Sequence, residues 1–283
     1  MSETRRVDLH VHTDASDGIY APEAVVDLAC AAGLAAIAVT DHDTTAGVER
    51  ARVRGREVGV EVVPGVELTA YAGPTEVHVL GLFVGGSDAG PTARVEELRG
   101  SRRTRMEKMV GKLADLGIEV GMDEVLAEAA GGALGRPHLA AVLVKRGYAA
   151  DAGEAFYRYL GQDGPVHVRK ERLTPFDAIA LVGDLGGIAV LAHPGANRVD
   201  ERLGEFRDAG LVGIEVWHPK HSPADVHHYA RLAGKHGLLP SGGSDFHGPG
   251  RSEGPMGMPE IGHEVLDRLR EAHAASVVAT GRA

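Results

Sequence analysis

Two pairs of metal-binding residue types stand out near opposite ends of the 283-residue sequence. His10 and His12 are separated by one residue, and so are Asp245 and His247. Because side chains alternate between the two faces of a β-strand, the members of each pair would point to the same side. Imidazole and carboxylate groups placed together suit zinc, iron or manganese. The spacing therefore predicts a metal site to which both ends of the sequence contribute.

Further candidate ligands lie between these pairs, each just after an apolar, strand-like run: Asp41-His42, Glu67, His78 and Ala192-His193-Pro194. Taken singly, several candidates have ordinary structural explanations. Asp17 could cap a turn, Asp43 could cap a helix, and His78, between two valines, could be a hydrogen-bonded core histidine. A buried acid such as Glu67 needs a partner or a metal ion. Their joint occurrence favours a polynuclear metal site, which makes hydrolysis of a phosphate ester the leading hypothesis.

The segments that must position these side chains alternate between strand-like and helix-like patterns. The expected strands are residues 7–12, 34–40, 60–64, 77–84, 188–192, 212–217 and 239–243. The expected helices are residues 22–32, 44–58, 175–185, 201–209, 223–236 and 262–274. This alternation predicts an α/β fold with a parallel sheet or barrel. An open doubly wound sheet would gather ligands at one switch point, whereas the candidates here follow nearly every strand, so a TIM-like (βα)7 barrel fits better.

The stretch from residue 91 to residue 164 interrupts the alternation and is predicted to be wholly helical. Its expected helices are residues 94–116, 123–130, 137–146 and 151–160, and glycine-rich segments flank them. The sequence therefore predicts a barrel made of residues 1–90 and 165–283. Residues 91–164 are expected to form a small helical insert that covers the active-site mouth.

The amino-acid composition limits the classes of molecule that this protein is expected to bind. The hydrophobic fraction of 43% and the charged fraction of 25% are ordinary for a globular protein. A formal net charge of −10 and an aromatic fraction of 4% argue against binding extended nucleic acid, and no segment is apolar over the length of a membrane span. Cys30 is the only cysteine and is expected in the core of a helix. With no intrachain disulfide possible, the sequence predicts a cytoplasmic location.

Taken together, these residues resemble the PHP (polymerase and histidinol phosphatase) family over most of the chain outside the insert. The resemblance implies a distorted seven-stranded α/β barrel with three divalent metal ions, manganese being expected and zinc or iron the alternatives. The nine matching positions are His10, His12, Asp17, His42, Glu67, His78, His193, Asp245 and His247. By this resemblance the three ion sites are, in turn, His10, His12, Glu67 and Asp245; then Glu67, His78 and His193; and lastly Asp17, His42 and His247.

The insert, with Gly135-Arg136-Pro137-His138, and the segment 213–219 are similar to the PHP subgroup that acts on nucleotides. This similarity implies hydrolysis of a nucleoside 3′,5′-bisphosphate or of a short RNA with a 5′-phosphate. Arg136 is the expected phosphate clamp, because a guanidinium donates paired hydrogen bonds to two phosphate oxygens. Lys170 is the second candidate for substrate binding, although Arg172 stands where the subgroup often has an aromatic residue.

The expected mechanism is metal-assisted hydrolysis by an activated water. Two ions can lower the pKa of the attacking water, and a third can offset charge on the phosphate. The proton for the leaving group would come from a metal-bound water, from His221 or from His218, and the sequence does not choose among them. Cys30 lies in a predicted helix, so nothing favours a cysteine nucleophile.

Other functions are compatible with parts of this pattern. One is a phosphatase for another small phosphomonoester, such as histidinol phosphate. Another is a noncatalytic PHP module that binds metal or nucleic acid, although such a module has no chemical need for the complete ligand set. A metal-dependent amidohydrolase shares His-x-His on a barrel, but no bridging-lysine context follows a middle strand. The oligomeric state is not determined by the sequence.

Overall fold

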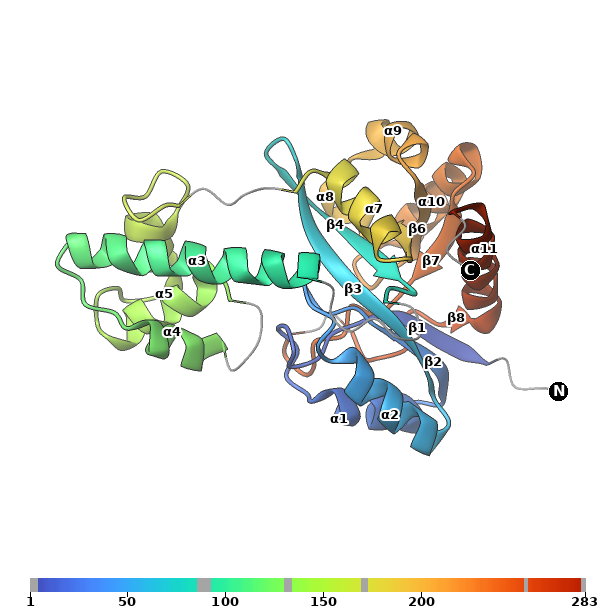
Figure 1. Ribbon diagram of the computed structural model, residues 1–283, viewed down its shortest axis with the longest axis horizontal. Coiled ribbons are helices and arrows are strands. Elements are labelled where there is room, and N and C mark those ends of the chain that lie inside the picture. Colours follow the sequence, from blue (N-terminus) through green and yellow to red (C-terminus); the bar gives the residue numbers. More distant parts are fainter. Residues whose placement is uncertain (1–4, 86–92, 130–133, 169–172, 252–253, 281–283) are drawn as a thin grey trace. The chain divides into compact units, whose positions relative to one another are not determined.

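The computed structural model describes residues 5–85, 93–129, 134–168, 173–251 and 254–280 (Figure 1). The chain divides into two compact units. One unit contains Met1–Thr92 and Arg172–Ala283, and the other contains Ala93–Glu171. Among the described residues, every helix is too short or too polar to cross a membrane.

The first unit is built on a mixed eight-stranded sheet with the strand order β7-β6-β5-β4-β3-β2-β1-β8. The strands are β1 (Arg6–Val11), β2 (Leu34–Val39), β3 (Glu61–Ala72), β4 (Thr75–Leu82), β5 (Ile188–Leu191), β6 (Leu211–Trp217), β7 (Leu239–Gly242) and β8 (Ile261–Gly262). The pairs β1–β2, β2–β3, β5–β6 and β6–β7 are parallel, whereas β4 runs antiparallel to β3 and β5. The two-residue β8 pairs antiparallel with β1.

The sheet nearly closes into a barrel at a seam between β1 and the segment after β7. Phe246 forms a parallel bridge with Val11, and its carbonyl oxygen accepts a hydrogen bond from the His12 N–H at 2.9 Å. Gly243 lies so close to β1 that a Cβ atom built on it would be 2.3 Å from the Cβ of His10. Only glycine permits this approach of two backbones. The seam therefore places residues 245–247 beside residues 10–12.

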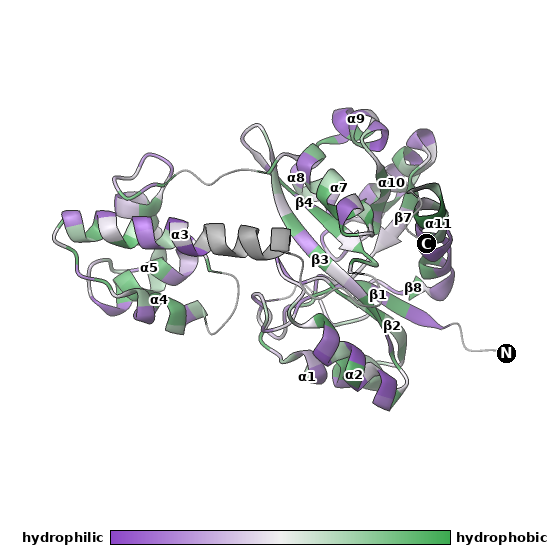
Figure 2. Cartoon of the chain, in the orientation of Figure 1, coloured by the Kyte–Doolittle hydropathy of each residue, from purple (hydrophilic) through white to green (hydrophobic). Residues whose placement is uncertain are grey.

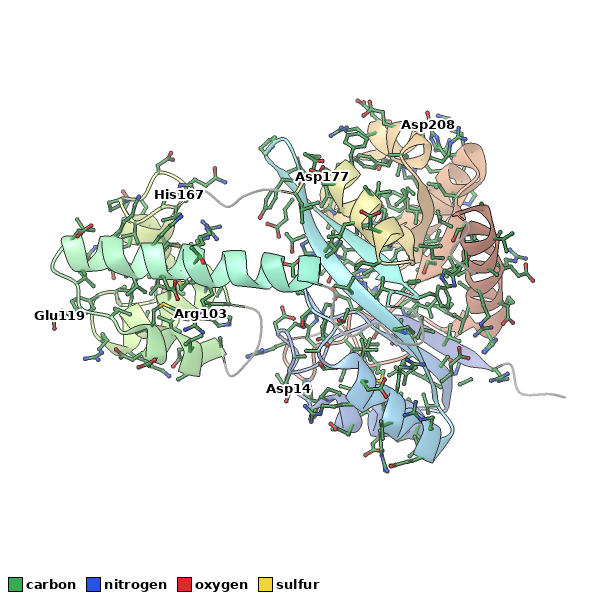
Figure 3. All side chains as sticks on the ribbon, in the orientation of Figure 1. Asp14, Arg103, Glu119, His167, Asp177 and Asp208 are labelled. Carbon is green, nitrogen blue, oxygen red and sulfur yellow. The ribbon has the colours of Figure 1, made fainter. Side chains whose placement is uncertain are left out.

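Helices flank this sheet (Figure 1). They are α1 (Pro22–Ala31), α2 (Val48–Val58), α7 (Pro175–Asp184), α8 (Pro194–Asn197), α9 (Leu203–Asp208), α10 (Pro223–His236) and α11 (His263–Thr280), with a 3-10 turn, η2 (Asp200–Arg202), before α9. Both α7 and α10 begin with a capping box, formed by Thr174 and Asp177 and by Ser222 and Asp225. Asp177 is labelled at this position in Figure 3. A proline in the first turn of each helix presets its backbone.

Apolar side chains from strands and helices form the core of the first unit. One buried cluster joins Leu9 and Val190 of the sheet to Leu266 of α11. A second joins Ile37 of β2 to Val26 of α1. Figure 2 shows hydrophilic residues concentrated on the outer faces of the helices around this sheet. The core thus holds the strands in register and leaves one rim of the barrel to the polar candidates.

The second unit is helical and contains α3 (Ala93–Asp115), α4 (Met122–Ala129), α5 (Arg136–Lys145), α6 (Ala152–Ala155) and a π-helical turn, η1 (Phe156–Leu160). Its own buried apolar cluster includes Met109, Leu113, Leu143 and Val166. Val166 lies beyond residue 164, where the helical pattern of the sequence ends. The unit therefore has a core of its own, and this core takes in part of the exit segment.

The structure differs from the sequence-based expectations in the middle of the sheet and on α1. β3 does not end near residue 64 but continues to Ala72 and turns back into β4. Glu67 consequently lies within a strand rather than just after one, and His78 lies within β4, as the expected strand 77–84 implies. The expectation that Cys30 is in the core is wrong, because this side chain is exposed. The buried face of α1 carries Val26 and Ala29, and Cys30 points away from that face.

Candidate metal centre

The structure brings the nine predicted ligands together in one cluster of the first unit. In each of them, a side-chain nitrogen or oxygen lies within 3.3 Å of such an atom in another predicted ligand. They come from β1 and the segment after it, from the segment after β2, from β3 and β4, and from the segments after β5 and β7. The isolated bridge between His42 and Glu67 aligns the end of β2 with the middle of β3.

The first set of predicted ligands is almost fully buried. His10 Nε2 lies 3.1 Å from His12 Nε2. The Oε2 atom of Glu67 is 3.3 Å from His10 Nε2 and 3.2 Å from His12 Nε2. The Oδ1 atom of Asp245 is 3.4 Å and 3.3 Å from the same two nitrogens. Two carboxylate oxygens and two imidazole nitrogens therefore converge on one point of the barrel rim.

Glu67 extends the cluster because its two oxygens face different neighbours. Its Oε1 atom is 2.8 Å from His78 Nδ1 and 3.2 Å from His193 Nε2. Its Oε2 atom, which faces His10 and His12, is also 3.2 Å from His42 Nδ1. The side chain of Glu67 is 1% exposed, so these imidazoles are its surroundings. This carboxylate is placed to bridge two cations.

The third set lies nearest to solvent. Asp17 Oδ1 is 3.2 Å from His247 Nε2, and Asp17 Oδ2 is 3.7 Å from His42 Nε2. The Nδ1 atom of His12 is 3.7 Å from Asp17 Oδ1, and the rings of His12 and His247 stack. The side chain of Asp17 is 40% exposed, against 0% for His12. His12 therefore faces the first set with one ring nitrogen and the third set with the other.

The spacing of these atoms fits metal coordination. Two nitrogen or oxygen ligands held about 2.1 Å from one tetrahedral ion are about 3.4 Å apart. The separations in the first set, 3.1–3.4 Å, agree with that value. In addition, several buried polar atoms have no hydrogen-bond partner among the described residues, namely His12 Nδ1, His42 Nδ1, Glu67 Oε2 and His193 Nδ1. Because buried polar atoms normally have partners, these atoms fit a site for cations.

Among the described residues, five non-glycine residues have a positive φ angle, and two of them are predicted ligands. His193 has a φ angle of 27° and Asp245 one of 50°. Non-glycine residues rarely adopt positive φ, and the conformation costs about 1–3 kcal/mol where it occurs. At both positions it directs a ligand toward the cluster just after a strand ends. In β1, the pairing register with β2 also shifts between Asp8 and Val11, an interval that contains His10.

Burial and charge shift the pKa values of these groups. Burial disfavours the charged form of His12, but the neighbouring carboxylates of Asp245 and Glu67 raise its pKa to about 10. Burial lowers the pKa of His42 to about 4. Burial also opposes ionisation of Glu67 and Asp245, yet the surrounding histidines hold both pKa values well below the usual range. The cluster thus contains carboxylates that remain ionised, as cation binding requires.

Buried carboxylates that are not predicted ligands hold the ligand-bearing segments. Asp8 accepts hydrogen bonds from the N–H groups of Ser244 and Gly257, at 2.8 Å each. Asp41 accepts from the N–H and hydroxyl of Thr13, at 2.7 Å each. Burial raises the pKa of both carboxyls. These two side chains fix the segments after β7 and β1, respectively.

Sequence reasoning gave no role to Glu215, although it lies beside the cluster. Its side chain is fully buried, and its oxygens contact His10 Nδ1 at 3.0 Å and the His193 N–H at 2.7 Å. A signal was present, because Glu215 stands within the apolar strand-like run 212–217. A carboxylate buried in such a run needs partners. The same rule, applied to Glu67, had pointed to a ligand.

Two histidines near the end of β6 differ in their hydrogen bonds. His221 Nδ1–H donates to the Val216 carbonyl at 2.9 Å, and its Nε2 accepts from the Gly195 N–H at 3.2 Å. Both ring nitrogens of His221 are therefore used within the fold. His218 Nδ1 accepts from the Lys220 N–H at 3.1 Å, which leaves the proton on Nε2. That buried atom lies 3.4 Å from Asp245 Oδ2.

Arg136, the expected phosphate clamp, belongs to the second unit. Arg136 begins α5 in the second unit, where its Nη1–H donates to the Leu160 carbonyl at 3.1 Å. Its guanidinium also lies over the ring of Phe156, 5.5 Å from the centroid. Lys170 and Arg172 are outside the described residues.

Known proteins of similar sequence and structure point to one family. The family model described as PHP domain matches residues 8–84. A 3′,5′-nucleoside bisphosphate phosphatase from Chromobacterium violaceum is 34% identical over 91% of this chain and 90% of its own length. A phosphoribosyl 1,2-cyclic phosphate 1,2-diphosphodiesterase from Eggerthella lenta is 36% identical over 91% and 98%. A 5′-3′ exoribonuclease from Haemophilus influenzae is 34% identical over 87% and 91%.

Solved structures agree with this relationship. A Bifidobacterium adolescentis protein provisionally named a metal-dependent phosphoesterase matches with a TM-score of 0.76 and 31% identity, covering 93% of this chain and 94% of its own. A Chromobacterium violaceum protein named an amidohydrolase, whose structure holds sulfate and no metal, matches with a TM-score of 0.75 and 32% identity, covering 94% and 96%. With this fold, this cluster and these relatives, the chain belongs to the PHP domain family.

Proposed function

We propose that this protein is a metal-dependent phosphoesterase that hydrolyses a phosphate ester of a nucleotide. The observation that carries the proposal is Glu67, a buried carboxylate whose two oxygens face separate groups of histidines. A bridging carboxylate of this kind is the feature that a polynuclear hydrolytic centre needs. The relatives named above are a phosphatase, a diphosphodiesterase and an exoribonuclease, which supports phosphoester hydrolysis.

The three proposed ion sites use the nine clustered side chains. The first comprises His10, His12, Glu67 and Asp245, the second Glu67, His78 and His193, and the third Asp17, His42 and His247. Divalent ions, with manganese preferred over zinc or iron, would supply Lewis acidity toward the phosphate and lower the pKa of a water. The protein holds the ligands rigidly, since burial and the strained backbones of His193 and Asp245 leave them little freedom.

The remaining residues are proposed to act on the substrate. Arg136 is the proposed phosphate clamp, and Lys170 the second cation. Of the two histidines considered for the leaving group, the hydrogen bonds favour His218, because its Nε2–H points toward Asp245 while both nitrogens of His221 are occupied. His221 would then act by joining the segment after β5 to the end of β6.

The proposed substrates are a nucleoside 3′,5′-bisphosphate and the 5′-phosphorylated end of a short RNA. The relative named as a bisphosphate phosphatase and the exoribonuclease match these two substrates in turn. Sulfate in the Chromobacterium violaceum structure has the charge and tetrahedral shape of phosphate, which is consistent with an anion site in this fold. The diphosphodiesterase relative, at 36% identity, favours one second candidate, a cyclic phosphodiester of ribose phosphate.

A manganese-supplemented phosphate-release screen tests the proposal. The substrates are a nucleoside 3′,5′-bisphosphate, a 5′-mononucleotide, a short 5′-phosphorylated RNA, histidinol phosphate and a ribose cyclic phosphodiester. Because neither opening of the cyclic diester nor exonucleolytic cleavage of the RNA releases inorganic phosphate, those two reactions are followed by chromatography. Metal-dependent turnover of the bisphosphate or the RNA is expected to be fastest. Absence of turnover with all five substrates, in a protein that binds metal, would favour the noncatalytic module.

A further inference from the structure

β6 differs from the other long strands around the barrel rim. β1–β5 and β7 each carry, or lead directly into, predicted ligands, whereas β6 provides none. Yet β6 places Glu215 beside the cluster with a side chain that is 0% exposed. Burying a carboxylate is costly unless it is paired and hydrogen-bonded. A fully buried acid on the strand that supplies no ligand therefore needs an explanation.

Each oxygen of Glu215 contacts a different predicted ligand. Oε1 lies 3.0 Å from His10 Nδ1, and Oε2 accepts from the backbone N–H of His193 at 2.7 Å. These two ligands come from β1 and from the segment after β5, far apart in the sequence. The His193 N–H can only donate, and an ionised carboxylate can only accept. Glu215 therefore holds the proton of His10 on Nδ1.

This proton position has a consequence for the other ring nitrogen of His10. Nε2 faces Glu67 Oε2 and Asp245 Oδ1 at 3.3 and 3.4 Å. With the proton on Nδ1, the Nε2 atom of a neutral ring presents its lone pair to that point, as a metal ligand must. The second oxygen of Glu215 accepts the hydrogen bond from the His193 N–H. This bond holds the backbone of His193, whose φ angle is 27°.

We propose that Glu215 is a positioning residue that sets the ring tautomer of His10 and the strained backbone of His193, and so couples the first and second ion sites. The inference rests on the proposed metal-dependent function. Glu215 itself need not touch metal or substrate. The proposed role requires two acceptor oxygens on one side chain, because both groups that Glu215 contacts are hydrogen-bond donors. Glutamine has nearly the same shape but only one acceptor oxygen.

Glu215→Gln is therefore an informative change. The amide oxygen can accept from the His193 N–H, and the amide NH₂ can then donate to His10 Nδ1. That arrangement moves the His10 proton to Nε2, where Glu67 and Asp245 accept it. The side chain at position 215 keeps both of its hydrogen bonds in the metal-free variant, whereas the His10 nitrogen that should bind the ion carries a proton. The effect of this variant on metal binding can therefore be measured separately from its effect on folding.

The experiment measures metal affinity and thermal unfolding of the full-length protein, with manganese as the probe. For E215Q we expect an unfolding temperature in chelator close to that of the wild type. We also expect manganese affinity about 10- to 100-fold weaker and a smaller rise in unfolding temperature on adding manganese. Glu215→Asp keeps two oxygens and should recover part of the affinity. Glu57→Gln, an exposed change that loses the same charge, should behave as the wild type.

The outcomes separate this inference from the proposed function. Wild-type manganese affinity in E215Q would overturn the positioning role, whether or not the variant loses stability in chelator. Weak manganese binding by the wild type itself would contradict the proposed function instead. Histidine ¹⁵N shifts of the metal-free protein, which report the proton position on His10, supply a readout independent of activity. They should differ between the wild type and E215Q.

Discussion

The rings of His12 and His247 stack face to face, with centroids 4.0 Å apart and planes inclined by 16°. His12 follows the first strand, and His247 follows β7. The same two segments are joined by the backbone hydrogen bond from the His12 N–H to the Phe246 carbonyl. The contacts that close the barrel therefore also bring ligands of the candidate metal centre together. A substitution that disrupts the seam should therefore also displace the metal ligands, and a substitution that displaces the ligands should weaken the seam.

Replacing Glu67 with glutamine should disable the centre. Its two oxygens face separate histidine groups, and an amide cannot offer two anionic acceptors. We expect fewer bound manganese equivalents per chain, measured by elemental analysis. We also expect phosphate release to slow by about 100-fold or more, since a bound ion contributes several kcal/mol to catalysis. Unchanged metal content would contradict the bridging role.

Chelation should remove the bound ions unequally. Asp17 of the third set is 40% exposed, whereas the four side chains of the first set are 0–16% exposed. We expect metal release into a chelator to be biphasic, with a fast phase from the third set. Asp17→Asn should abolish the fast phase and leave the slow one. A single phase in the wild type, or loss of both phases in the variant, would refute this order.

Replacing Gly243 with alanine should strain the seam. A Cβ atom there would be 2.3 Å from the Cβ of His10, so β1 or the segment after β7 must move. The cost to the free energy of unfolding should be about 1–3 kcal/mol, the range found for overpacked cores. Chemical denaturation measures it.

The matched control for this change is Gly234→Ala on α10, where a new Cβ has no neighbour within 4 Å. Alanine in a helix is better than glycine by about 0.5–1 kcal/mol. The two alanine variants should therefore change stability in opposite directions. Equal effects would show that the approach of Gly243 to β1 is not constraining.

His221 should affect stability and its pH dependence rather than catalysis. Burial lowers the pKa of this imidazole below its ordinary value, near 6.5 in unfolded chains. Between the two values the unfolded chain binds more protons, so stability falls as the pH is lowered from about 7. His221→Gln should flatten that slope relative to the wild type, as followed by denaturation at several pH values. The exposed His227→Gln should not do so.

The same variants separate the two histidines at the end of β6. Per folded molecule, His221→Gln should retain kcat within about threefold, whereas His218→Ala should lose more than tenfold if its N–H serves the centre. Steady-state kinetics with the best substrate of the screen gives both values. A larger loss of kcat in the His221 variant would restore that residue as the proton donor.

Much of this architecture follows from local patterns. The barrel class, α10 and the ligand spacings of His10, His12, Asp245 and His247 all follow from periodicity and strand ends. The antiparallel course of β4 does not, because a strand pattern has the same alternation in either direction. Nor does the length of β3, which is expected to end near residue 64 but continues past Glu67 to Ala72. Strand direction is set by tertiary pairing, which a local pattern does not contain.

Burial of single residues was harder to predict than element type. Cys30 belongs to an apolar run on α1, but a difference of one position on a helix turns a side chain by about 100°. Cys30 therefore lies off the face that carries Val26 and Ala29. Glu215 is the opposite case, because it is an acidic residue that is buried. Its partners are His10 and His193, and both lie far from it in the sequence. Contacts between distant segments decide both cases.

The seam also has a consequence for the order in which this protein matures. During synthesis, a chain that has emerged through α10 holds every proposed ligand except Asp245 and His247, and it lacks the Phe246 strand partner of β1. Domains generally fold as units as their residues emerge from the ribosome. The first ion site therefore cannot be completed until the segment after β7 docks. Nascent chains are thereby kept from gaining a complete hydrolytic centre before the barrel closes.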